Sequence, residues 1–282
     1  MIQAPDKDAL RVVMRGYRSN SETTAFVPTL GNLHEGHLSL VRKAKEVADR
    51  VVVSIFLNPT QFDKPEDLAN YPKTLKNDLE LLKKENVDSV FLPSADEMYP
   101  EGGTTRVEVD GISDILEGDS RPGHFSGVAT IVAKLFNLVQ PDISIFGEKD
   151  YQQLMLIRRM EADLDYGIEI ISAPTAREKS GLAMSSRNNY LTEEQRGIIA
   201  PHLHQALQEI KRNIVEFKNS GYSELQESTA ESLDKLGFRT DYIEIRNAND
   251  LSIATKCDKE LVILASAWLG KARLIDNLRV SL

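Results

Sequence analysis

Two histidines three residues apart are the part of the sequence with the clearest capacity for chemistry. His34 and His37 close the stretch Pro-Thr-Leu-Gly-Asn-Leu-His-Glu-Gly-His at residues 28–37, directly after the apolar run 25–27. The apolar run predicts a buried strand, and the residues after it predict the start of a helix. Backbone N–H groups and the helix dipole favour phosphate at such a junction, and an imidazole near neutral pH can donate a hydrogen bond or a proton. The stretch therefore indicates a nucleotide site.

The histidine pair also has two readings without phosphate chemistry. Both side chains could be ordinary surface or capping residues. A zinc site would need further ligands, and neither a cysteine pair nor a His-Glu-x-x-His helix lies nearby. Gly31 and Gly36 favour the nucleotide reading, because glycine allows a tight turn and the close approach of a ligand to the helix start.

Uncharged amides follow the second predicted strand, at residues 50–56. Asn58 and Gln61 lie just beyond its carboxyl end, where open α/β sheets bind their ligands. Amides can bind a hydroxyl group and a carboxylate without fixing a charge. The alternative for Asn58 is an Asx-type turn before Pro59.

A second phosphate-type segment follows the predicted strand at residues 142–146. It reads Gly-Glu-Lys-Asp at residues 147–150 and leads into a helix. Lys149 would place a point charge on phosphate, Asp150 could accept hydrogen bonds from ribose hydroxyls, and Gln153 would face the same crevice one turn on. The alternative is a simple helix start with acidic residues in its first turn.

Two further segments carry candidate binding groups. The irregular linker after residue 176 contains Met-Ser-Ser-Arg at residues 184–187, which offers two hydroxyls, backbone donors and a guanidinium. Such an anion-binding segment between domains suits a closing lid, and a plain loop is the alternative. Arg121 and His124, ahead of another helix, could meet a carboxylate or serve no binding role. Three of the five histidines fall in the candidate segments. A chance arrangement would scatter the histidines along the chain.

The first 175 residues alternate strand-like and helix-like segments, which predicts an α/β fold with a Rossmann-like parallel sheet covered by helices. Several strands are continuous apolar runs, as expected for strands buried on both faces. The expected strands are 25–29, 50–56, 87–92, 142–146 and 167–172. The expected helices are 6–18, 37–48, 74–85, 126–139 and 149–164.

The rest of the chain predicts a smaller α+β domain. Two segments look like helix capping boxes, Thr192 to Gln195 and Ser223 to Gln226, and the helices are expected to run to about residues 218 and 236. We expect a sheet domain of residues 1–176 and a lid domain of residues 177–282. The expected strands of the second domain are 240–246, 261–269 and 272–280, with a tight turn at 269–271.

Composition excludes several classes of function. The chain has 282 residues, 41% hydrophobic and 27% charged, with a net charge of −9. The acidic balance argues against sequence-independent nucleic-acid binding, and no run approaches the ~20 apolar residues of a membrane span. The first 18 residues lack the apolar core of a signal peptide. The single cysteine, Cys257, cannot form an internal disulfide, which fits a cytoplasmic setting.

Five motifs occur in order between about residues 20 and 195: Pro-Thr-Leu-Gly-Asn-Leu-His-Glu-Gly-His, Phe-Leu-Asn-Pro-Thr-Gln-Phe, Arg-Pro-Gly-His-Phe, Phe-Gly-Glu-Lys-Asp-Tyr-Gln-Gln and Gly-Leu-Ala-Met-Ser-Ser-Arg-Asn. Together they closely resemble the pantothenate synthetase family, which belongs to the nucleotidyltransferase superfamily marked by a His-x-x-His-type motif. The total length of the chain also fits that family.

The resemblance implies a reaction and its partners. ATP and (R)-pantoate would give pantoyl adenylate and pyrophosphate, and β-alanine would then attack the adenylate to give pantothenate and AMP. Mg²⁺ with ATP, a homodimer and a cytoplasmic setting are also implied. Residues 1–176 would bind ATP and pantoate, and residues 177–282 would form the lid.

The resemblance also implies roles for individual residues, carried over by position. His37 matches the residue assigned as proton donor. Gln61 matches a residue that contacts pantoate and lies near β-alanine, and Gln153 matches a second pantoate contact. The implied ATP-binding positions are Leu30, Gly31, Asn32, Leu33, His34, Glu35, Gly36, His37, Gly147, Glu148, Lys149, Asp150, Ala176, Met184, Ser185, Ser186 and Arg187.

Four positions depart from the family pattern. Leu30 and Asn32 stand where Met and Ala are more usual. The site should tolerate Leu30, because leucine has nearly the volume of methionine. Ser180 stands where the linker usually has an acidic residue. Asn77 stands where a carboxylate is common, so no protein ligand for Mg²⁺ can be named and the phosphates are expected to hold the ion.

Two other functions stay open. A nucleotidylyltransferase acting on a phosphorylated alcohol would share the superfamily's site. The paired glutamines favour a small hydroxy acid instead, because a phosphate ester would require more Arg and Lys side chains. A non-catalytic nucleotide sensor would bind ATP without turnover.

Overall fold

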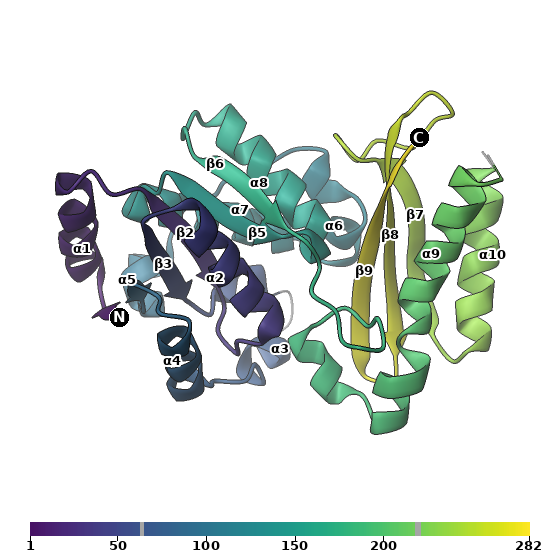
Figure 1. The fold of residues 1–282 in the computed structure, drawn as a ribbon, viewed down its shortest axis with the longest axis horizontal. Coiled ribbons are helices and arrows are strands. Elements are labelled where there is room, and N and C mark those ends of the chain that lie inside the picture. The colour runs from purple at the N-terminus through teal and green to yellow at the C-terminus, as the bar shows by residue number, and fades with distance from the viewer. Residues whose placement is uncertain (63–64, 218–220) are drawn as a thin grey trace. The chain divides into compact units, whose positions relative to one another are not determined.

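The computed structural model describes residues 1–62, 65–217 and 221–282, and the chain divides into two compact units. The N-terminal unit comprises Met1–Gly147 and Gln152–Ala173, and the C-terminal unit comprises Glu148–Tyr151 and Pro174–Leu282. Each unit has its own sheet and its own apolar core (Figure 1).

The N-terminal unit is built on a six-stranded parallel sheet with the order β1-β4-β3-β2-β5-β6. Chain order reverses at β2, because β3 and β4 lie on one side of it and β5 and β6 on the other. The carboxyl ends of β2 and β5 therefore flank the topological switch point, where open sheets bind ligands. The strands are β1 (Ile2–Ala4), β2 (Thr24–Thr29), β3 (Arg50–Ile55), β4 (Ser89–Phe91), β5 (Ile143–Gly147) and β6 (Glu169–Ala173).

Helices connect the parallel strands, as parallel pairing requires. The longer ones are α1 (Lys7–Ser19), α2 (Glu35–Val47), α4 (Leu75–Lys84), α7 (His124–Val139) and α8 (Tyr151–Asp163). The shorter ones are α3 (Pro65–Ala69), α5 (Ala95–Met98), α6 (Glu117–Ser120) and the 3₁₀ helices η1 (Pro59–Gln61), η2 (Pro100–Gly102) and η3 (Ile112–Asp114).

Helices cover both faces of this sheet, which explains why its central strands carry continuous apolar runs such as residues 25–27 and 51–53 (Figure 1). Phe26 and Phe146 belong to the core that includes residues of α1, α7 and α8. Their chain neighbours Val27 and Ile145 belong to a second core with residues of α2 and α4. Successive side chains of a strand point to opposite faces, so a central strand needs apolar residues toward both cores. The expected α/β class is confirmed.

The C-terminal unit has a three-stranded antiparallel sheet in the order β7-β8-β9. Leu203, Leu207 and Ile210 follow helical spacing on α9 and share one core with Ile263 of the sheet. The elements are η4 (Glu148–Asp150), η5 (Ser186–Tyr190), the π-helical turn η6 (Gln195–Ile199), α9 (His202–Val215), α10 (Tyr222–Lys235), β7 (Arg239–Asn247), β8 (Glu260–Leu269) and β9 (Ala272–Ser281).

The expected strands and helices of the first 175 residues are present, with ends shifted by at most two residues. The sequence did not indicate β1, which has three residues and exposes Ile2 by 51%. A strand this short and this exposed carries little apolar signal. Helix α2 begins at Glu35 rather than at residue 37, because the side chain of His34 caps it.

One expected capping box is confirmed. The Gln195 N–H donates to Thr192 Oγ1 at 3.1 Å, and the Thr192 N–H donates to Gln195 Oε1 at 3.0 Å. The helix that follows is not continuous, since a π-helical turn leads to Pro201, which has no N–H to donate, and α9 starts only at His202. Its expected end at residue 218 lies outside the described residues.

The second expected capping box is wrong. Helix α10 begins at Tyr222 with Gly221 as its N-cap, so Ser223 lies inside the helix. The Gln226 side chain accepts a hydrogen bond from the Ile245 N–H at 3.1 Å instead of reaching back to the helix start. The Gln226 side chain, which the local pattern assigned to the helix cap, therefore contacts strand β7 instead.

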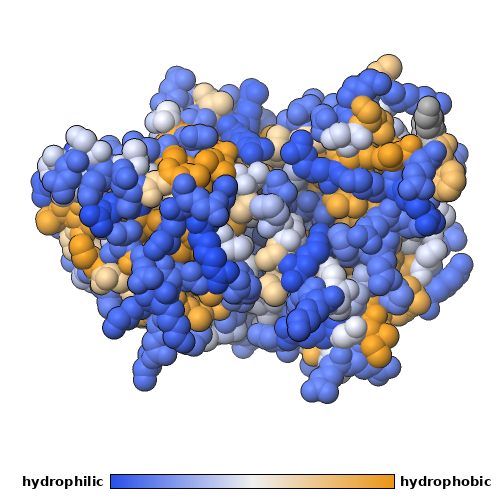
Figure 2. Space-filling view, viewed as in Figure 1, coloured by the Kyte–Doolittle hydropathy of each residue, from blue (hydrophilic) through white to orange (hydrophobic). Residues whose placement is uncertain are grey.

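The face shown in Figure 2 is mostly hydrophilic, and its apolar side chains gather in separate patches. Exposed large hydrophobic residues include Val12, Ile198, Phe217 and Ile253. Scattered apolar side chains of this kind are ordinary on folded proteins. Across the described ranges, no helix combines the length and the apolar character needed to cross a membrane.

Alanine substitutions at two helical glycines test how closely α7 must approach η1. A Cβ at residue 127 would lie 2.4 Å from the carbonyl oxygen of Thr60, whereas a Cβ at residue 16 would have nothing within 4 Å. We expect Gly127→Ala to lower the free energy of unfolding by about 1–3 kcal/mol through overpacking. The matched control Gly16→Ala should raise it by about 0.5–1 kcal/mol, because alanine is the better helix former. Urea unfolding measures both, and equal effects would contradict the close approach.

Candidate active site

The loop after β2 turns through two residues in the left-handed region. Gly31 has a φ of +85° and Asn32 a φ of +52°. A Cβ on Gly31 would lie 3.1 Å from Ile55 Cγ2 and 3.2 Å from Asp78 Oδ2, so the turn needs glycine for both its conformation and its space. Asparagine tolerates the left-handed region better than alanine does, which explains why Asn32 suits this place.

Asp78 holds this loop in place, and the sequence did not single it out. Its carboxylate is 1% exposed and accepts the backbone N–H groups of Asn32 and Leu33, each at 2.9 Å. The Thr74 hydroxyl donates to the same carboxylate at 3.1 Å. A buried charge is stable only when hydrogen bonds replace its water, and these three donors do so. The residue lies more than forty positions from the loop, so no local pattern pointed to it.

His34 and His37 form a capping pair at the start of α2. The Nδ1 atom of His34 accepts the Gly36 N–H at 3.1 Å, and the Nδ1 atom of His37 accepts the His34 N–H at 3.3 Å. The two ring centroids are 4.2 Å apart. A nitrogen that accepts a hydrogen bond carries no proton, so each neutral ring carries its proton on Nε2. The backbone of the helix start thus selects the tautomer.

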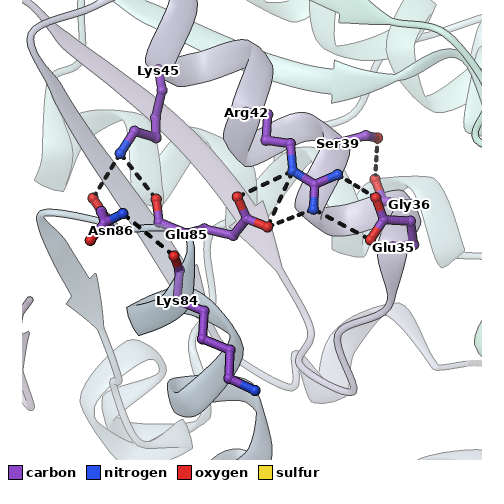
Figure 3. A network of polar contacts seen from close by, with 8 residues as sticks. All are labelled: Glu35, Gly36, Ser39, Arg42, Lys45, Lys84, Glu85 and Asn86. Carbon is purple, nitrogen blue, oxygen red and sulfur yellow. Dashed lines mark hydrogen bonds and ion pairs between the residues drawn. The ribbon is translucent and has the colours of Figure 1, made fainter.

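A polar network on the outer side of α2 ties it to the end of α4 (Figure 3). Arg42 lies between two carboxylates, pairing with Glu35 in the first turn of α2 and with Glu85 at the end of α4, where Nη2 and Oε1 are 2.6 Å apart. Lys45 donates to the carbonyl oxygens of Glu85 and Asn86 at 3.0 and 3.1 Å. Helix α4 therefore contacts the phosphate-type loop through Asp78 and α2 through Glu85.

Four of the expected substrate residues lie together beyond the end of β3. The Asn58 amide donates to Gln61 Oε1 at 3.0 Å and to the Gly127 carbonyl at 3.1 Å. His124 Nδ1 lies 2.8 Å from the Gln61 carbonyl oxygen, and Arg121 Nη1 lies 3.2 Å from His124 Nε2. Arg121 and His124 thus contact the main chain of Gln61 and fix η1 against α7.

Tyr99 completes this cluster and was not expected. Its hydroxyl donates to Asn58 Oδ1 at 2.7 Å. Burial raises the pKa of the Tyr99 hydroxyl, although the hydrogen bond with Thr60 partly offsets the effect. The phenol therefore stays protonated near neutral pH and remains the donor that Asn58 needs.

The two glutamines at the start of α8 have different surroundings. Gln152 is buried; its amide donates to the carbonyls of Ile112 and Ile115 at 2.7 and 2.8 Å, and it accepts the Glu117 N–H. Gln153, the expected pantoate contact, is half-buried on the same helix. Because β3 and β5 flank β2, Gln61 and Gln153 follow strands on the two sides of the histidine loop.

In the C-terminal unit, the segment after Gly147 is held by a residue of β9. The Asn277 amide donates to the carbonyl oxygens of Glu148 and Lys149, both at 2.8 Å. The Lys149 side chain is 17% exposed, and its Nζ lies 3.8 Å from Asp150 Oδ1. Asn277 is more than a hundred residues away in the chain, so the sequence carried no sign of this support.

The remaining ATP candidates lie on a hairpin-like segment of the same unit. The Met184 N–H donates to the Ala176 carbonyl at 2.9 Å, which brings these two expected residues together. Ser185 caps η5 by accepting the Arg187 N–H at 3.2 Å, while Ser186 starts that 3₁₀ helix. Arg187 is exposed, so its guanidinium is available to an anionic ligand.

The carboxylate nearest the histidine loop is already used within the protein. Asp78 accepts hydrogen bonds from three donors, and Asn77 beside it is exposed. Among residues 1–62, 65–217 and 221–282, no group of three His, Cys, Asp or Glu side chains could hold a metal ion. A Mg²⁺ ion that entered with a nucleotide would not require such a group, because Mg²⁺ keeps several waters and binds largely through substrate phosphates.

These features define a class. The protein belongs to the α/β class that binds nucleotide phosphates. Its parallel sheet carries a glycine turn and a histidine-capped helix start at the topological switch point. Polar side chains after the neighbouring strand add a place for a small second substrate.

Comparison with known proteins identifies the family. Residues 4–279 match the pantoate-beta-alanine ligase family, and the chain belongs to it. The crystal structure of pantothenate synthetase from Thermus thermophilus is 43% identical, with a TM-score of 0.91 and 99% of each chain covered. The pantoate-beta-alanine ligase from Francisella tularensis, complexed with beta-gamma ATP and beta-alanine, is 38% identical with a TM-score of 0.79, covering 99% of this chain and 97% of the other. The chain is therefore an enzyme, a ligase that forms pantothenate.

The role of Asp78 can be tested with a nearly isosteric change. Asp78→Asn places an amide N–H against a backbone N–H and leaves buried donors without an acceptor. We expect the free energy of unfolding to fall by about 1–3 kcal/mol and ATP binding to weaken. Chemical unfolding and ATP titration calorimetry measure the two effects. The exposed Glu80 on the same helix provides the control, Glu80→Gln, which should change neither. Wild-type ATP affinity in a folded Asp78→Asn variant would contradict the assignment.

Proposed function

We propose that the enzyme forms pantothenate in two steps at the carboxyl edge of the parallel sheet. A carboxylate oxygen of (R)-pantoate attacks the α-phosphorus of ATP, and the bond to pyrophosphate breaks. The amine of β-alanine then attacks the acyl carbon, AMP leaves, and the amine loses a proton. The capping pair His34 and His37, at the start of α2, is the observation that carries this proposal.

Charge is the physical problem in the first step, because an anion must attack another anion. We propose that Lys149 and Arg187 neutralise phosphate charge and that the N–H groups at the start of α2 add fixed dipoles. The same set stabilises the charge that moves onto the departing pyrophosphate. The proposed nucleotide contacts are those named from the sequence, residues 30–37 and 147–150, Ala176 and residues 184–187.

We propose that His37 donates a hydrogen bond from Nε2 to a phosphoryl oxygen and so stabilises the charge that develops as the pyrophosphate leaves. The backbone supports this role, because the His34 N–H occupies Nδ1 and leaves Nε2 as the donor. His34 would make a phosphate contact through its own Nε2. Neither ring needs a change of tautomer during the step.

We propose that Gln61 and Gln153 hold pantoate in line for attack, and that Asn58, which is fully buried, acts by orienting Gln61 rather than by touching the substrate. Holding two reactants in a fixed geometry removes much of the entropic barrier of a bimolecular step. The cluster beyond β3 supports this assignment, because Asn58 donates to Gln61 Oε1 and so orients its amide group. Arg121 and His124 would act on Gln61 through its carbonyl.

We propose that Mg²⁺ enters with ATP and is held mainly by its phosphates, where it would neutralise phosphate charge. We also propose a homodimer and a cytoplasmic setting. Residues 1–176 would form the domain that binds ATP and pantoate, and residues 177–282 the smaller lid domain. The family likeness supports these assignments, and light scattering would test the dimer by giving twice the mass of one chain.

Omitting one substrate at a time separates the proposed reaction from its rivals. We expect AMP release only when ATP, pantoate and β-alanine are all present, and pyrophosphate exchange with ATP when pantoate alone is added. Exchange that needs a phosphorylated alcohol would indicate a nucleotidylyltransferase. ATP binding without any turnover would indicate a nucleotide sensor.

Replacing His37 tests its proposed contact with the phosphoryl oxygen. His37→Ala should reduce pantoate-dependent ATP–pyrophosphate exchange by about 100-fold or more, the usual cost of removing a hydrogen-bond donor to a developing charge. His202, on α9, has no proposed role, so His202→Ala is the matched control and should keep its activity. Circular dichroism establishes that both variants fold. Exchange near the wild-type rate in His37→Ala would rule out the role.

A further inference from the structure

A buried ion cluster in the C-terminal unit lies outside every role described so far. Asp276 of β9 is 4% exposed and accepts Arg177 Nη1 at 2.6 Å and Nη2 at 2.8 Å. His204 of α9 lies with its Nδ1 3.3 Å from Asp276 Oδ2. The Asn277 N–H also donates to this carboxylate at 2.8 Å. One carboxylate thus joins a strand, a helix and the segment after Ala176.

The Asp276 carboxylate is ionised in this setting. Burial raises the pKa of the Asp276 carboxyl, but the adjacent His204 and the Arg177 guanidinium outweigh burial and hold that pKa below its ordinary value. A bidentate pair between a guanidinium and a carboxylate fixes direction as well as distance. Arg177 is therefore held in one orientation at the base of its segment.

Arg177 closes a tight hairpin with its other contacts. Its Nη1 donates to the Gly181 carbonyl at 3.1 Å, and residues 177 and 183 form an antiparallel bridge. The Glu178 N–H donates to the Leu182 carbonyl at 2.8 Å and closes the next rung. The chain leaves this hairpin at Met184, the first residue of the Met-Ser-Ser-Arg segment. The orientation of Arg177 therefore sets where that segment begins.

Two consecutive residues of β9 hold the two segments of this unit that are proposed to bind ATP. Asp276 reaches Arg177 and the hairpin, and Asn277 reaches the carbonyl oxygens of Glu148 and Lys149. Neighbouring side chains of a strand point to opposite faces, so one strand can support one segment on each side. Strand β9 packs beside α9 and gains rigidity from its full-length pairing with β8 (Figure 1).

We propose that Asp276 is a positioning residue for ATP binding: through Arg177 it fixes the hairpin of residues 176–184, and with it the start of the segment 184–187. The inference rests on the proposed ATP contacts of that segment. A purely structural role would stabilise the C-terminal unit without changing the affinity for ATP. The two roles therefore differ in what the loss of the carboxylate does to the folded enzyme.

The test compares Asp276→Asn with Asp241→Asn in the full-length enzyme. Asp241 of β7 pairs with Arg273 Nε at 2.6 Å in the same sheet and has no proposed role, so it is a matched loss of one ion pair. We expect Asp276→Asn to raise the KM for ATP in pantoate-dependent exchange about tenfold or more, since a small displacement of a binding group costs up to about 100-fold. Asp241→Asn should stay within about twofold of the wild type.

Trypsin gives a second readout that does not depend on activity. Lys179 and Arg187 are exposed on the segment, and we expect faster cleavage after them in Asp276→Asn than in the wild type or in Asp241→Asn. An unchanged KM with unchanged cleavage in folded Asp276→Asn overturns the inference, even if its melting temperature falls. If the wild type shows no pantoate-dependent exchange, the proposed function fails, and the affinity of the folded variants for ATP, measured by titration calorimetry, still decides the inference.

A second variant covers the case in which Asp276→Asn does not fold. Arg177→Lys keeps the positive charge beside Asp276 but loses the bidentate pair and the contact with Gly181. The same rise in KM and the same faster cleavage are expected. A folded Arg177→Lys enzyme with the wild-type KM for ATP and wild-type cleavage would also overturn the inference.

Discussion

The hydrogen bonds that the loop after β2 donates to a buried carboxylate are the contacts on which the proposed phosphate site depends. Asp78 accepts two consecutive backbone N–H groups, from Asn32 and Leu33, and so turns the chain toward the start of α2. The room left for this turn is small, because an added Cβ at Gly31 would meet the carboxylate at 3.2 Å. The positions of both histidines follow from this turn, since His34 is the next residue and caps the helix.

A similar arrangement recurs at the other candidate segments, where a residue distant in the chain holds the backbone or side chain of a segment proposed to bind a ligand. Asn277 holds the carbonyl oxygens of Glu148 and Lys149. Tyr99 orients the Asn58 amide through its oxygen, and Gly127 allows η1 to lie against α7. Supporting residues of this kind keep binding groups in place before the ligand arrives, which lowers the entropy cost of binding.

The histidine pair shows how the backbone can select a chemical state. A free imidazole exchanges between two tautomers, and a phosphate contact needs the one whose outward nitrogen carries the proton. Here the N–H groups of Gly36 and His34 occupy Nδ1 of the two rings, so both protons lie on Nε2. The same two side chains complete a hydrogen-bonded helix start and offer Nε2–H donors to the proposed phosphate.

The sequence by itself determined the fold class, the family and the residues proposed to face ligands, because each of these leaves a local signal. Apolar runs such as 51–53 indicated strands buried on both faces, and the histidine and glycine spacing of residues 31–37 indicated a helix start that is proposed to bind a ligand. Only the tertiary structure decided which residues support them. Asp78, Asp276 and Asn277 act on segments far away in the chain, and Gln226 bonds to β7 instead of capping its helix. Such contacts depend on which elements pack together, and a local pattern of residue types contains no record of that.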